Sequence, residues 1–300
     1  MAGNSLALDG PVVPSFLYGC AEKPDPSVIL AALNAGYRGI DSACQPQFYD
    51  EKAIGQAIAS ALSPVSGGGL GLKRRGLFVQ TKFTTPAGHK PHLAPYLGED
   101  LPEVKVRKSL DMSLAKLGVD YVDCLLLHGP MPTLGETLEI WAGMESVCDK
   151  VLSLGLSNVS LEQLEAVYNH ATIKPAIVQN RFWYHNHFDS AVRSFCAENN
   201  IVYQAFWVLT GNPQLLDSNF VGWLAERVGA SREDTLFSLV LSLGQDGPQV
   251  SVLNGTTNPE RMLRSLEVVR RMGEVPEFVR QGFVDELDSL AKRLKNTSTA

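Results

Sequence analysis

Four side chains in this chain are of types that can move a proton or stabilise charge, and each lies at or near the end of an apolar segment. Asp41 lies near the end of YRGIDS, Lys82 lies in LFVQTKF, His128 ends YVDCLLLH, and Tyr49 follows Asp41 closely. Taken singly, each has an ordinary interpretation as a turn residue, a surface residue or a structural histidine. Taken together they favour one shared site, because charged and imidazole groups at the ends of hydrophobic strands are costly without local partners.

These four residue types suit the reduction of a carbonyl group. Asp41 can neutralise Lys82, and the Lys82 ammonium can favour the phenolate of Tyr49. A free tyrosine has a pKa of about 10, and an adjacent ammonium is expected to lower it. Tyr49 could then donate a proton to a carbonyl oxygen as hydride arrives at the carbon, with His128 orienting that oxygen.

The segments that must position these residues alternate between strand and helix patterns. Apolar runs that read as strands cover residues 16–20, 37–42, 77–83, 121–128, 151–157, 176–180, 201–207 and 249–255. Between them, segments such as PSVILAALNAG and VRKSLDMSLAKLG have apolar residues at helical spacing. Eight buried strands with helices between them predict a (β/α)₈ TIM barrel, whose strand ends share one mouth. An open doubly wound sheet is the rival interpretation.

The domain organisation expected is one barrel domain over residues 1–300. Residues 63–76 (SPVSGGGLGLKRRG) are predicted to be a flexible loop, because they contain no phosphate-binding glycine motif and precede a strand. An amphipathic C-terminal helix is predicted over 274–294 and a frayed polar tail over 295–300.

Composition narrows the partners. The formal net charge of −6 argues against a nucleic-acid or anionic-membrane partner. The sequence contains no apolar run long enough to span a bilayer and no secretory signal pattern. Its five cysteines are scattered and include no C-x-x-C pair, which predicts a reduced, cytoplasmic chain without a metal site. The expected partner is a small carbonyl compound.

Several segments, in this order, resemble those of the aldo-keto reductases, a family of NADP(H)-dependent (β/α)₈ barrels. They are GYRGIDSA, LFVQTKF, SLAKLGVDYVDCLLLHGP, LSLGLSNVSLEQLE, IKPAIVQN and NGTTNPERMLRSLEVV. The resemblance covers nearly the whole chain. It implies that Asp41, Tyr49, Lys82 and His128 form a catalytic tetrad and that the cofactor is NADP(H).

The same resemblance implies a set of cofactor-binding residues. Ser157, Asn158 and Gln179 fall where the family holds the nicotinamide carboxamide. Phe206 falls where an aromatic ring stacks on the nicotinamide, with Leu209 nearby. The 2′-phosphate would be bound by Thr256, Thr257, Asn258 and Arg261. An arginine suits this role because its planar fork can clamp two phosphate oxygens, and a helix N-terminus adds backbone donors.

Three features depart from the family pattern. The chain is two residues longer between Asp41 and Glu51, so Phe48 falls at the usual tyrosine position. We assign the proton donor to Tyr49, since it alone of the two has a proton to give. Asn254 and Gly255 replace a basic residue that often precedes the phosphate-binding turn, and Trp207 replaces a small serine.

The expected substrate pocket is aromatic and favours an apolar or aromatic carbonyl compound. Its predicted lining residues are Phe48, Phe83, Trp183, Tyr184 and Trp207.

Two other functions remain open from the sequence. The chain could be a cofactor-binding barrel with a regulatory or structural role, since a fold does not imply a function. It could also be a metal-dependent barrel hydrolase, for which the HNH stretch at His185–His187 follows a predicted strand.

Overall fold

The computed structural model describes residues 13–245, 249–272 and 275–297. Eight parallel strands pair in chain order, and β1 pairs with β8, so the sheet closes into a barrel. The predicted TIM barrel is therefore confirmed, and the open sheet is excluded. The strands are β1 (Phe16–Gly19), β2 (Gly39–Asp41), β3 (Phe78–Phe83), β4 (Cys124–Leu127), β5 (Leu154–Ser157), β6 (Ile177–Arg181), β7 (Val202–Phe206) and β8 (Val250–Asn254).

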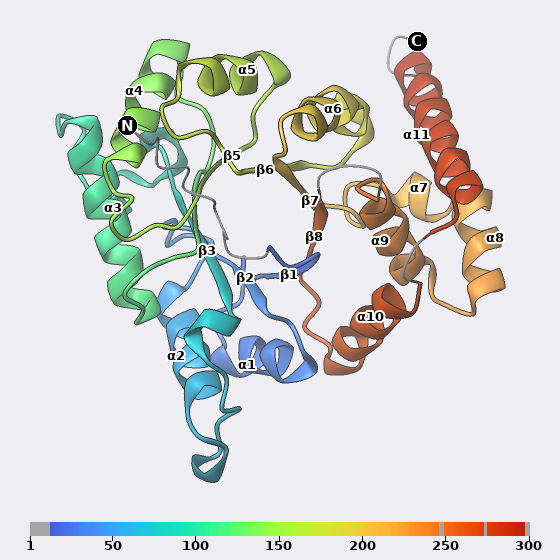
Figure 1. Cartoon of the computed structure of the whole chain (residues 1–300), viewed down its shortest axis with the longest axis horizontal. Helices are drawn as coiled ribbons and strands as arrows, with labels where there is room; N and C mark the ends of the chain where they lie inside the picture. Colours follow the sequence, from blue (N-terminus) through green and yellow to red (C-terminus); the bar gives the residue numbers. More distant parts are fainter. Residues whose placement is uncertain (1–12, 246–248, 273–274, 298–300) are drawn as a thin grey trace, which may run out of the picture.

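Helices surround the strands (Figure 1). They are α1 (Pro26–Ala35), α2 (Glu51–Leu62), α3 (Pro102–Leu117), α4 (Leu134–Glu145), α5 (Leu161–His170), α6 (Ser190–Glu198), α7 (Pro213–Leu216), α8 (Asn219–Val228), α9 (Arg232–Ser242), α10 (Pro259–Met272) and α11 (Glu277–Thr297). The connection between β7 and β8 carries α7, α8 and α9, whereas most other connections carry one α-helix. No helix of the described chain is both long and apolar enough to cross a membrane.

Alternation along β3 decides which side chains reach the barrel interior. Successive residues of a strand point to opposite faces, so Gln80, Lys82 and, just beyond the strand, Thr84 share one face. Lys82 makes its ion pair across the interior, with Asp41 of β2. Phe83 points the other way and stacks on Tyr96, with ring centroids 5.4 Å apart. At its carboxyl end, β3 therefore sends the polar side chain of Lys82 into the barrel and the apolar side chain of Phe83 away from it.

The polar residues singled out in the sequence lie at the same end of the barrel. Asp41 ends β2, Ser157 ends β5 and Phe206 ends β7, while His128 directly follows β4. Because parallel strands bring their carboxyl ends together, one mouth receives side chains from segments far apart in the chain.

Two predicted segment boundaries differ from the structure. Helix α11 runs over Glu277–Thr297 instead of 274–294, so part of the predicted tail is helical; residues 298–300 lie outside the described chain. The 63–76 segment contains two 3₁₀ turns, η1 (Val65–Gly67) and η2 (Arg74–Gly76). Its flexibility stays a prediction.

Candidate active site

A buried ion pair lies beneath the mouth of the barrel. Lys82 Nζ is 2.6 Å from Asp41 Oδ1, and both side chains are almost fully buried. Lys82 also donates to the Ser42 carbonyl at 2.8 Å. Burial by itself would lower the pKa of Lys82, but Asp41 and Tyr49 together with Cys20 outweigh that effect, and the pKa is raised. Lys82 therefore carries its charge at neutral pH.

Three glutamines surround this ion pair. Gln80 and Gln179 both donate to Asp41 Oδ1, the latter at 2.9 Å. Gln204 accepts from both glutamines at 2.9 Å and donates back to Gln80 at 3.1 Å. Buried polar groups need such partners, because an unpaired one costs its full desolvation free energy. The network holds Asp41, and through it Lys82, in one position.

Tyr49, and not Phe48, is turned toward the ion pair. Lys82 Nζ lies 5.3 Å from the centroid of the Tyr49 ring, whereas the Phe48 side chain is 48% exposed. Burial raises the pKa of Tyr49 above its usual range, while attraction to Lys82 and hydrogen bonding to it act in the opposite direction. The expectation that Lys82 would lower this pKa overall is therefore wrong, because desolvation of the phenolate dominates.

His128 is a neutral imidazole beside the tyrosine. Its ring packs edge-on against Tyr49, with centroids 6.2 Å apart. Burial and the nearby Lys82 charge lower the pKa of His128 to about 3. Its Nδ1 atom lies 2.9 Å from Thr84 Oγ1. If the Thr84 hydroxyl donates to Nδ1, Nε2 carries the hydrogen and becomes a donor, as polarisation of a carbonyl oxygen requires.

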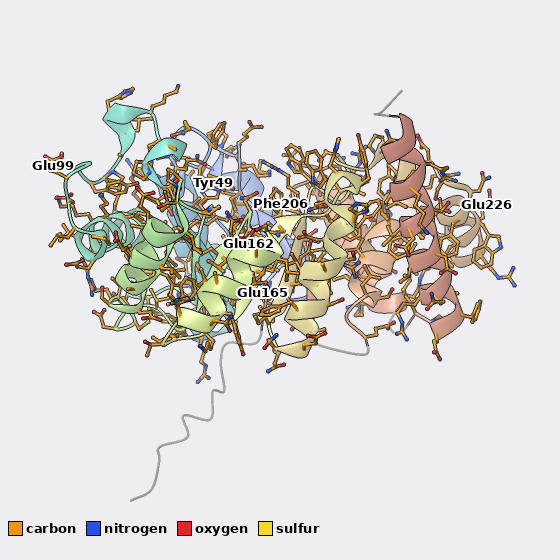
Figure 2. All side chains as sticks on the ribbon, turned by 90° about the horizontal axis from the view of Figure 1, so that it is seen from above. Tyr49, Glu99, Glu162, Glu165, Phe206 and Glu226 are labelled. Atoms are coloured by element: carbon orange, nitrogen blue, oxygen red, sulfur yellow. The ribbon has the colours of Figure 1, made fainter. Side chains whose placement is uncertain are left out.

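A hollow of about 520 Å³ opens over these groups, and we call it the mouth hollow. Three of the four predicted catalytic residues line it: Asp41, Tyr49 and His128. Lys82 lies behind Asp41. The predicted cofactor residues that line it are Ser157, Asn158, Gln179, Phe206, Leu209, Thr256 and Arg261. Figure 2 shows Tyr49 and Phe206 in the central part of the molecule, whereas Glu99 and Glu226 lie at its outer edges.

Asn158 is held in the left-handed region, with φ 56°. Asparagine tolerates this conformation better than most residues. Its Nδ2 donates to the His128 carbonyl at 2.9 Å and to Ser157 Oγ at 3.1 Å. The loop after β5 is thereby joined to the loop after β4, so the expected carboxamide partners are fixed relative to His128.

The far end of the mouth hollow is shaped by the loop between β8 and α10. Asn258 caps α10, since its Oδ1 accepts from the Arg261 backbone at 3.0 Å. Tyr18 donates to the Thr256 carbonyl at 3.0 Å, and Asn254 accepts from the Thr256 backbone at 2.9 Å. Exposed Arg261 therefore lies in the first turn of a pinned helix, where the helix dipole also favours an anion.

The same end has a second cation, which sequence reasoning missed. Lys23 lines the mouth hollow, and a Cβ placed on Gly255 would lie 3.2 Å from Lys23 Nζ. Lys23 follows β1 in the loop toward α1, so its position after a strand end was the signal that could have identified it. It supplies from another strand the positive charge that Asn254 and Gly255 lack. Together, Lys23, Arg261 and the α10 N-terminus fit a phosphate-bearing dinucleotide.

Sequence reasoning also missed the polar residues of the barrel interior and one exposed arginine. Gln80 and Thr84 share the inward face of β3 with Lys82, Gln204 shares the face of Phe206 on β7, and Arg181 shares the face of Gln179 on β6. In each case the signal was a spacing of two residues from a residue already identified.

Several residues predicted for the site do not line the mouth hollow. Phe83 is fully buried and packed outward on Tyr96, so the prediction that it contacts substrate is wrong. Phe48, Thr257 and Asn258 do not line it either, although Asn258 organises it as the α10 cap.

The remaining predicted aromatics form a group beyond Phe206. Trp207 lines the mouth hollow. The Trp183 ring packs against the Trp207 ring, with centroids 5.9 Å apart. The Tyr184 ring lies against that of His185, tilted by 31° with centroids 4.0 Å apart, and Tyr184 is not among the residues lining the mouth hollow. Of the predicted substrate residues, the structure therefore brings only Trp207 to the mouth hollow.

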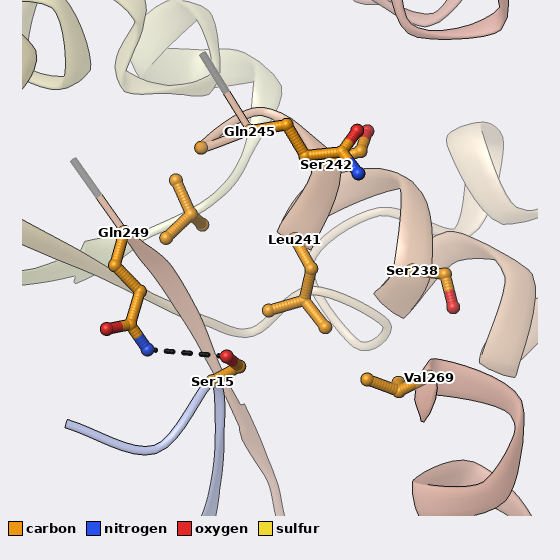
Figure 3. A pocket seen from close by; sticks show the side chains of 9 residues that line it. Ser15, Ser238, Leu241, Ser242, Gln245, Gln249 and Val269 are labelled. Atoms are coloured by element: carbon orange, nitrogen blue, oxygen red, sulfur yellow. Dashed lines mark hydrogen bonds between the residues drawn. The ribbon is translucent and has the colours of Figure 1, made fainter. Parts of the chain in front are cut away.

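Another hollow, of about 340 Å³, lies at the opposite end of the strands (Figure 3). Ser15 and Gln249, which precede β1 and β8, are joined by a 3.3 Å hydrogen bond at its edge. In barrels of this type, the amino ends of the strands contribute to stability and the carboxyl ends to chemistry. We therefore place the candidate active site in the mouth hollow. Within the described residues, no group of three or more His, Cys, Asp or Glu side chains is placed to hold a metal ion.

The fold and this site define a class of protein: a closed (β/α)₈ barrel with an ion-paired lysine, a tyrosine and a neutral histidine at the mouth hollow. Comparison with known proteins assigns the chain to a family of the same class. The model of the Aldo/keto reductase family matches residues 26–219, and the chain belongs to that family. The protein is thus an oxidoreductase that acts on carbonyl compounds.

Individual relatives are similar over most of their length. An aldo-keto reductase from Mycolicibacterium vanbaalenii is 30% identical over 266 residues, which cover 87% of this chain and 84% of the relative. A solved aldo-keto reductase from a Medee basin deep-sea metagenome library has a TM-score of 0.73 at 21% identity, covering 92% of this chain and 91% of that one. A solved mutant of Gox0644 in complex with NADPH has a TM-score of 0.70 at 21% identity, covering 92% and 89%.

Proposed function

We propose that this protein reduces an aldehyde or ketone to an alcohol with NADPH, and that Tyr49 donates the proton. The observation that carries the proposal is the stack of groups under the mouth hollow. Asp41 holds Lys82 at 2.6 Å, Lys82 lies 5.3 Å from the Tyr49 ring centroid, and Tyr49 packs against neutral His128. When bound, the reduced nicotinamide supplies the hydride.

Each residue of the stack has a separate role in this proposal. Tyr49 keeps its proton at neutral pH, because burial raises its pKa, and releases it as negative charge develops on the substrate oxygen. Lys82 stabilises the phenolate left behind. His128 is neutral and can donate a hydrogen bond to the same oxygen from Nε2, which holds the carbonyl in line with Tyr49.

The proposed cofactor site extends along the mouth hollow. Ser157, Asn158 and Gln179 would orient the nicotinamide amide, and Phe206 would cover one face of its ring. Arg261, Lys23 and the N-terminus of α10 would bind the phosphates at the other end. Among the described residues that line this hollow the single acid is Asp41, which is paired with Lys82, so the exposed charges favour the additional 2′-phosphate of NADPH. The NADPH bound by Gox0644 supports the same choice.

The cysteine arrangement supports a reducing, cytoplasmic location as part of this proposal. All five cysteines are free, and four of them are buried. Free thiols persist in compartments where glutathione keeps them reduced.

A turnover assay with both nicotinamides tests the proposal. Purified protein is mixed with NADPH or NADH and a panel of aldehydes and ketones, and the loss of reduced cofactor and the formation of alcohol are measured. We expect alcohol to form in proportion to cofactor oxidised, with a higher kcat/KM for NADPH. Tight NADPH binding without turnover of any carbonyl compound would instead support the regulatory or structural role.

A further inference from the structure

Arg181 is an exposed cation beside the reacting groups that the proposed reaction leaves without a role. It ends β6, two residues after Gln179, so both side chains share one face of the strand. Its Cα pairs with that of Phe206 on β7. Arg181 lines the mouth hollow and also a second, smaller hollow of about 280 Å³, which we call the side hollow.

Three aromatic rings hold the Arg181 guanidinium. Its Cζ atom lies 4.7 Å from the ring centroid of Trp207, 5.8 Å from that of Phe206 and 5.9 Å from that of Trp183. Cation–π contacts fix the plane of a guanidinium but use none of its N–H donors. The cradle therefore positions the group while leaving its hydrogen-bonding capacity available.

Trp207 adopts an uncommon backbone conformation in this cradle. Its φ is 61°, in the left-handed region that bulky residues avoid, and its side chain is 48% exposed. Gly211 donates its backbone N–H to the Trp207 carbonyl at 2.8 Å, and Asn212 Nδ2 donates to the same oxygen at 3.3 Å. Strained residues persist where the surroundings over-determine them, commonly at binding sites. Here the turn presents the indole to Arg181.

No carboxylate of the described chain lies within ion-pair distance of the Arg181 side chain. The acid of the mouth hollow, Asp41, is occupied by Lys82. An exposed arginine fixed in place with free N–H groups is suited to bind a carboxylate in a bidentate fashion.

The side hollow connects this cation to the reacting groups. Its lining includes Gln45, Thr84, Thr85, His128, Asn158 and Arg181. His128 and Arg181 thus border the same small space, and its other walls are mostly polar. This contrasts with the apolar substrate pocket expected from the sequence.

We propose that Arg181 binds a carboxylate on the substrate, so that the preferred substrates are aldehydes or ketones that also carry a carboxylate group. This inference rests on the proposed carbonyl reduction. The carbonyl oxygen would lie against Tyr49 and His128, and the carboxylate of the same molecule would reach Arg181 through the side hollow. The cofactor phosphates are better served by Lys23 and Arg261, which lie at the Gly255–Thr256 end of the mouth hollow.

Matched substrate pairs test the inference. 4-Carboxybenzaldehyde is compared with 4-formylbenzamide, and 3-carboxybenzaldehyde with 3-formylbenzamide, since each pair differs chiefly in charge. Hydrogen bonds to charged groups contribute about 1.5–3 kcal/mol, so we expect the better carboxylate to be preferred about 10- to 100-fold in kcat/KM. In Arg181→Gln, the ratio of kcat/KM for the carboxylate to that for the amide should fall about tenfold or more. In Arg181→Lys, the ratio should lie between those of the wild type and Arg181→Gln, because a lysine keeps the charge but lacks the planar guanidinium.

Arg227→Gln is the matched control. Arg227 also lies over a tryptophan, 5.6 Å from the Trp223 ring centroid, but on α8 and away from the mouth hollow. Its substitution should leave the substrate ratio unchanged. An Arg181→Gln protein with the wild-type ratio, or a wild-type protein without a preference, would overturn the inference. So would an equal loss for both members of a pair together with a tenfold weaker NADPH affinity, since Arg181 would then serve the cofactor.

A binding measurement separates this inference from the proposed reaction. Benzoate and benzamide are titrated calorimetrically into the wild type and Arg181→Gln with NADP⁺ present. If the wild type binds benzoate more tightly than benzamide and Arg181→Gln does not, the anion site is supported. It is supported even if no aldehyde is reduced, and only the proposed reaction then fails. Equal binding of benzoate by both proteins overturns the site even if every aldehyde is reduced.

Discussion

The acidity of Tyr49 is set by two opposing influences. Burial makes the phenolate costly and raises the pKa of Tyr49, whereas the Lys82 ammonium favours the phenolate. Since burial dominates, the phenol holds its proton at neutral pH until an acceptor appears. That behaviour suits a general acid in carbonyl reduction better than a base in alcohol oxidation.

Removal of the Tyr49 hydroxyl should therefore affect turnover more than binding. General acid catalysis typically contributes about 10²- to 10⁴-fold, so Tyr49→Phe should lower kcat for aldehyde reduction by that order. The affinity for NADPH, measured by fluorescence titration, should change little in comparison. Tyr121→Phe, which removes the hydroxyl from a tyrosine stacked on Arg74 outside the mouth hollow, is the control. Full activity of Tyr49→Phe would show that another group donates the proton.

Asp41 and Lys82 should be coupled in stability as well as in catalysis. Breaking a buried ion pair typically costs about 3–5 kcal/mol, because one charge is left without its partner. Lys82→Met and Asp41→Asn should each lower the free energy of unfolding by roughly that amount in urea titrations. The double variant should lose clearly less than the sum of the two. Strict additivity would mean that the two charges do not depend on each other.

At the scale of elements, the positions of the strands could be predicted from the sequence, but the conformations of the loops could not. All eight predicted strands are present, and each observed strand lies within the predicted range or extends past it by a single residue, as at Arg181. Apolar runs identify buried strands because the periodicity is local. Because successive residues of a strand point to opposite faces, identifying one inward residue predicts the direction of its neighbours. Lys82 points inward, so Phe83 next to it should point outward. Applied at the outset, this rule would have corrected the prediction made for Phe83.

The start of α10 is the element on which the proposed phosphate site depends. Loss of an N-cap costs about 1 kcal/mol, and Asn258→Ala should destabilise the protein by about that much. Without the cap, the first turn of α10 should fray and no longer hold Arg261 at the mouth hollow. A loss of about 1 kcal/mol in binding free energy corresponds to roughly fivefold weaker NADPH binding.

Thr133→Ala is the control for this cap, because Thr133 forms a capping box at the start of α4. It should lower stability to a similar extent, with unchanged NADPH affinity by fluorescence titration. Equal affinities in both variants would argue that Arg261 does not bind the cofactor.

At the scale of the whole molecule, the sign of the charge at the mouth hollow is opposite to that of the net charge. The formal net charge is −6, yet Lys23, Arg181 and Arg261 all line the mouth hollow. An acidic surface around a basic mouth can concentrate anionic ligands at one place. Composition indicated which partners to exclude, but it could not show this local reversal of sign.

Global stability should fall on acidification because His128 resists protonation in the fold. Its pKa is lowered to about 3 by burial and by Lys82, against about 6.5 in an unfolded chain. Between these values the unfolded state binds the additional proton, so stability is lost as pH falls, by at most about 1.4 kcal/mol per pH unit. Urea titrations from neutral pH downward should show a shallower decline for His128→Asn, whereas His92→Asn, at an exposed position, should follow the wild type. Parallel curves for wild type and His128→Asn would contradict this account.

The sequence by itself determined the positions of the strands, the residue types at the strand ends and the family they indicate, because periodicity and chemical type are local properties of the chain. An open sheet remained the rival of a barrel until the structure showed β1 paired with β8. Only the tertiary structure decided that Tyr49 and not Phe48 faces Lys82, that burial outweighs Lys82 in setting the pKa of Tyr49, and that Lys23 and Arg181 enter the mouth. Those outcomes depend on desolvation and on through-space contacts between distant segments, which no single stretch of sequence contains.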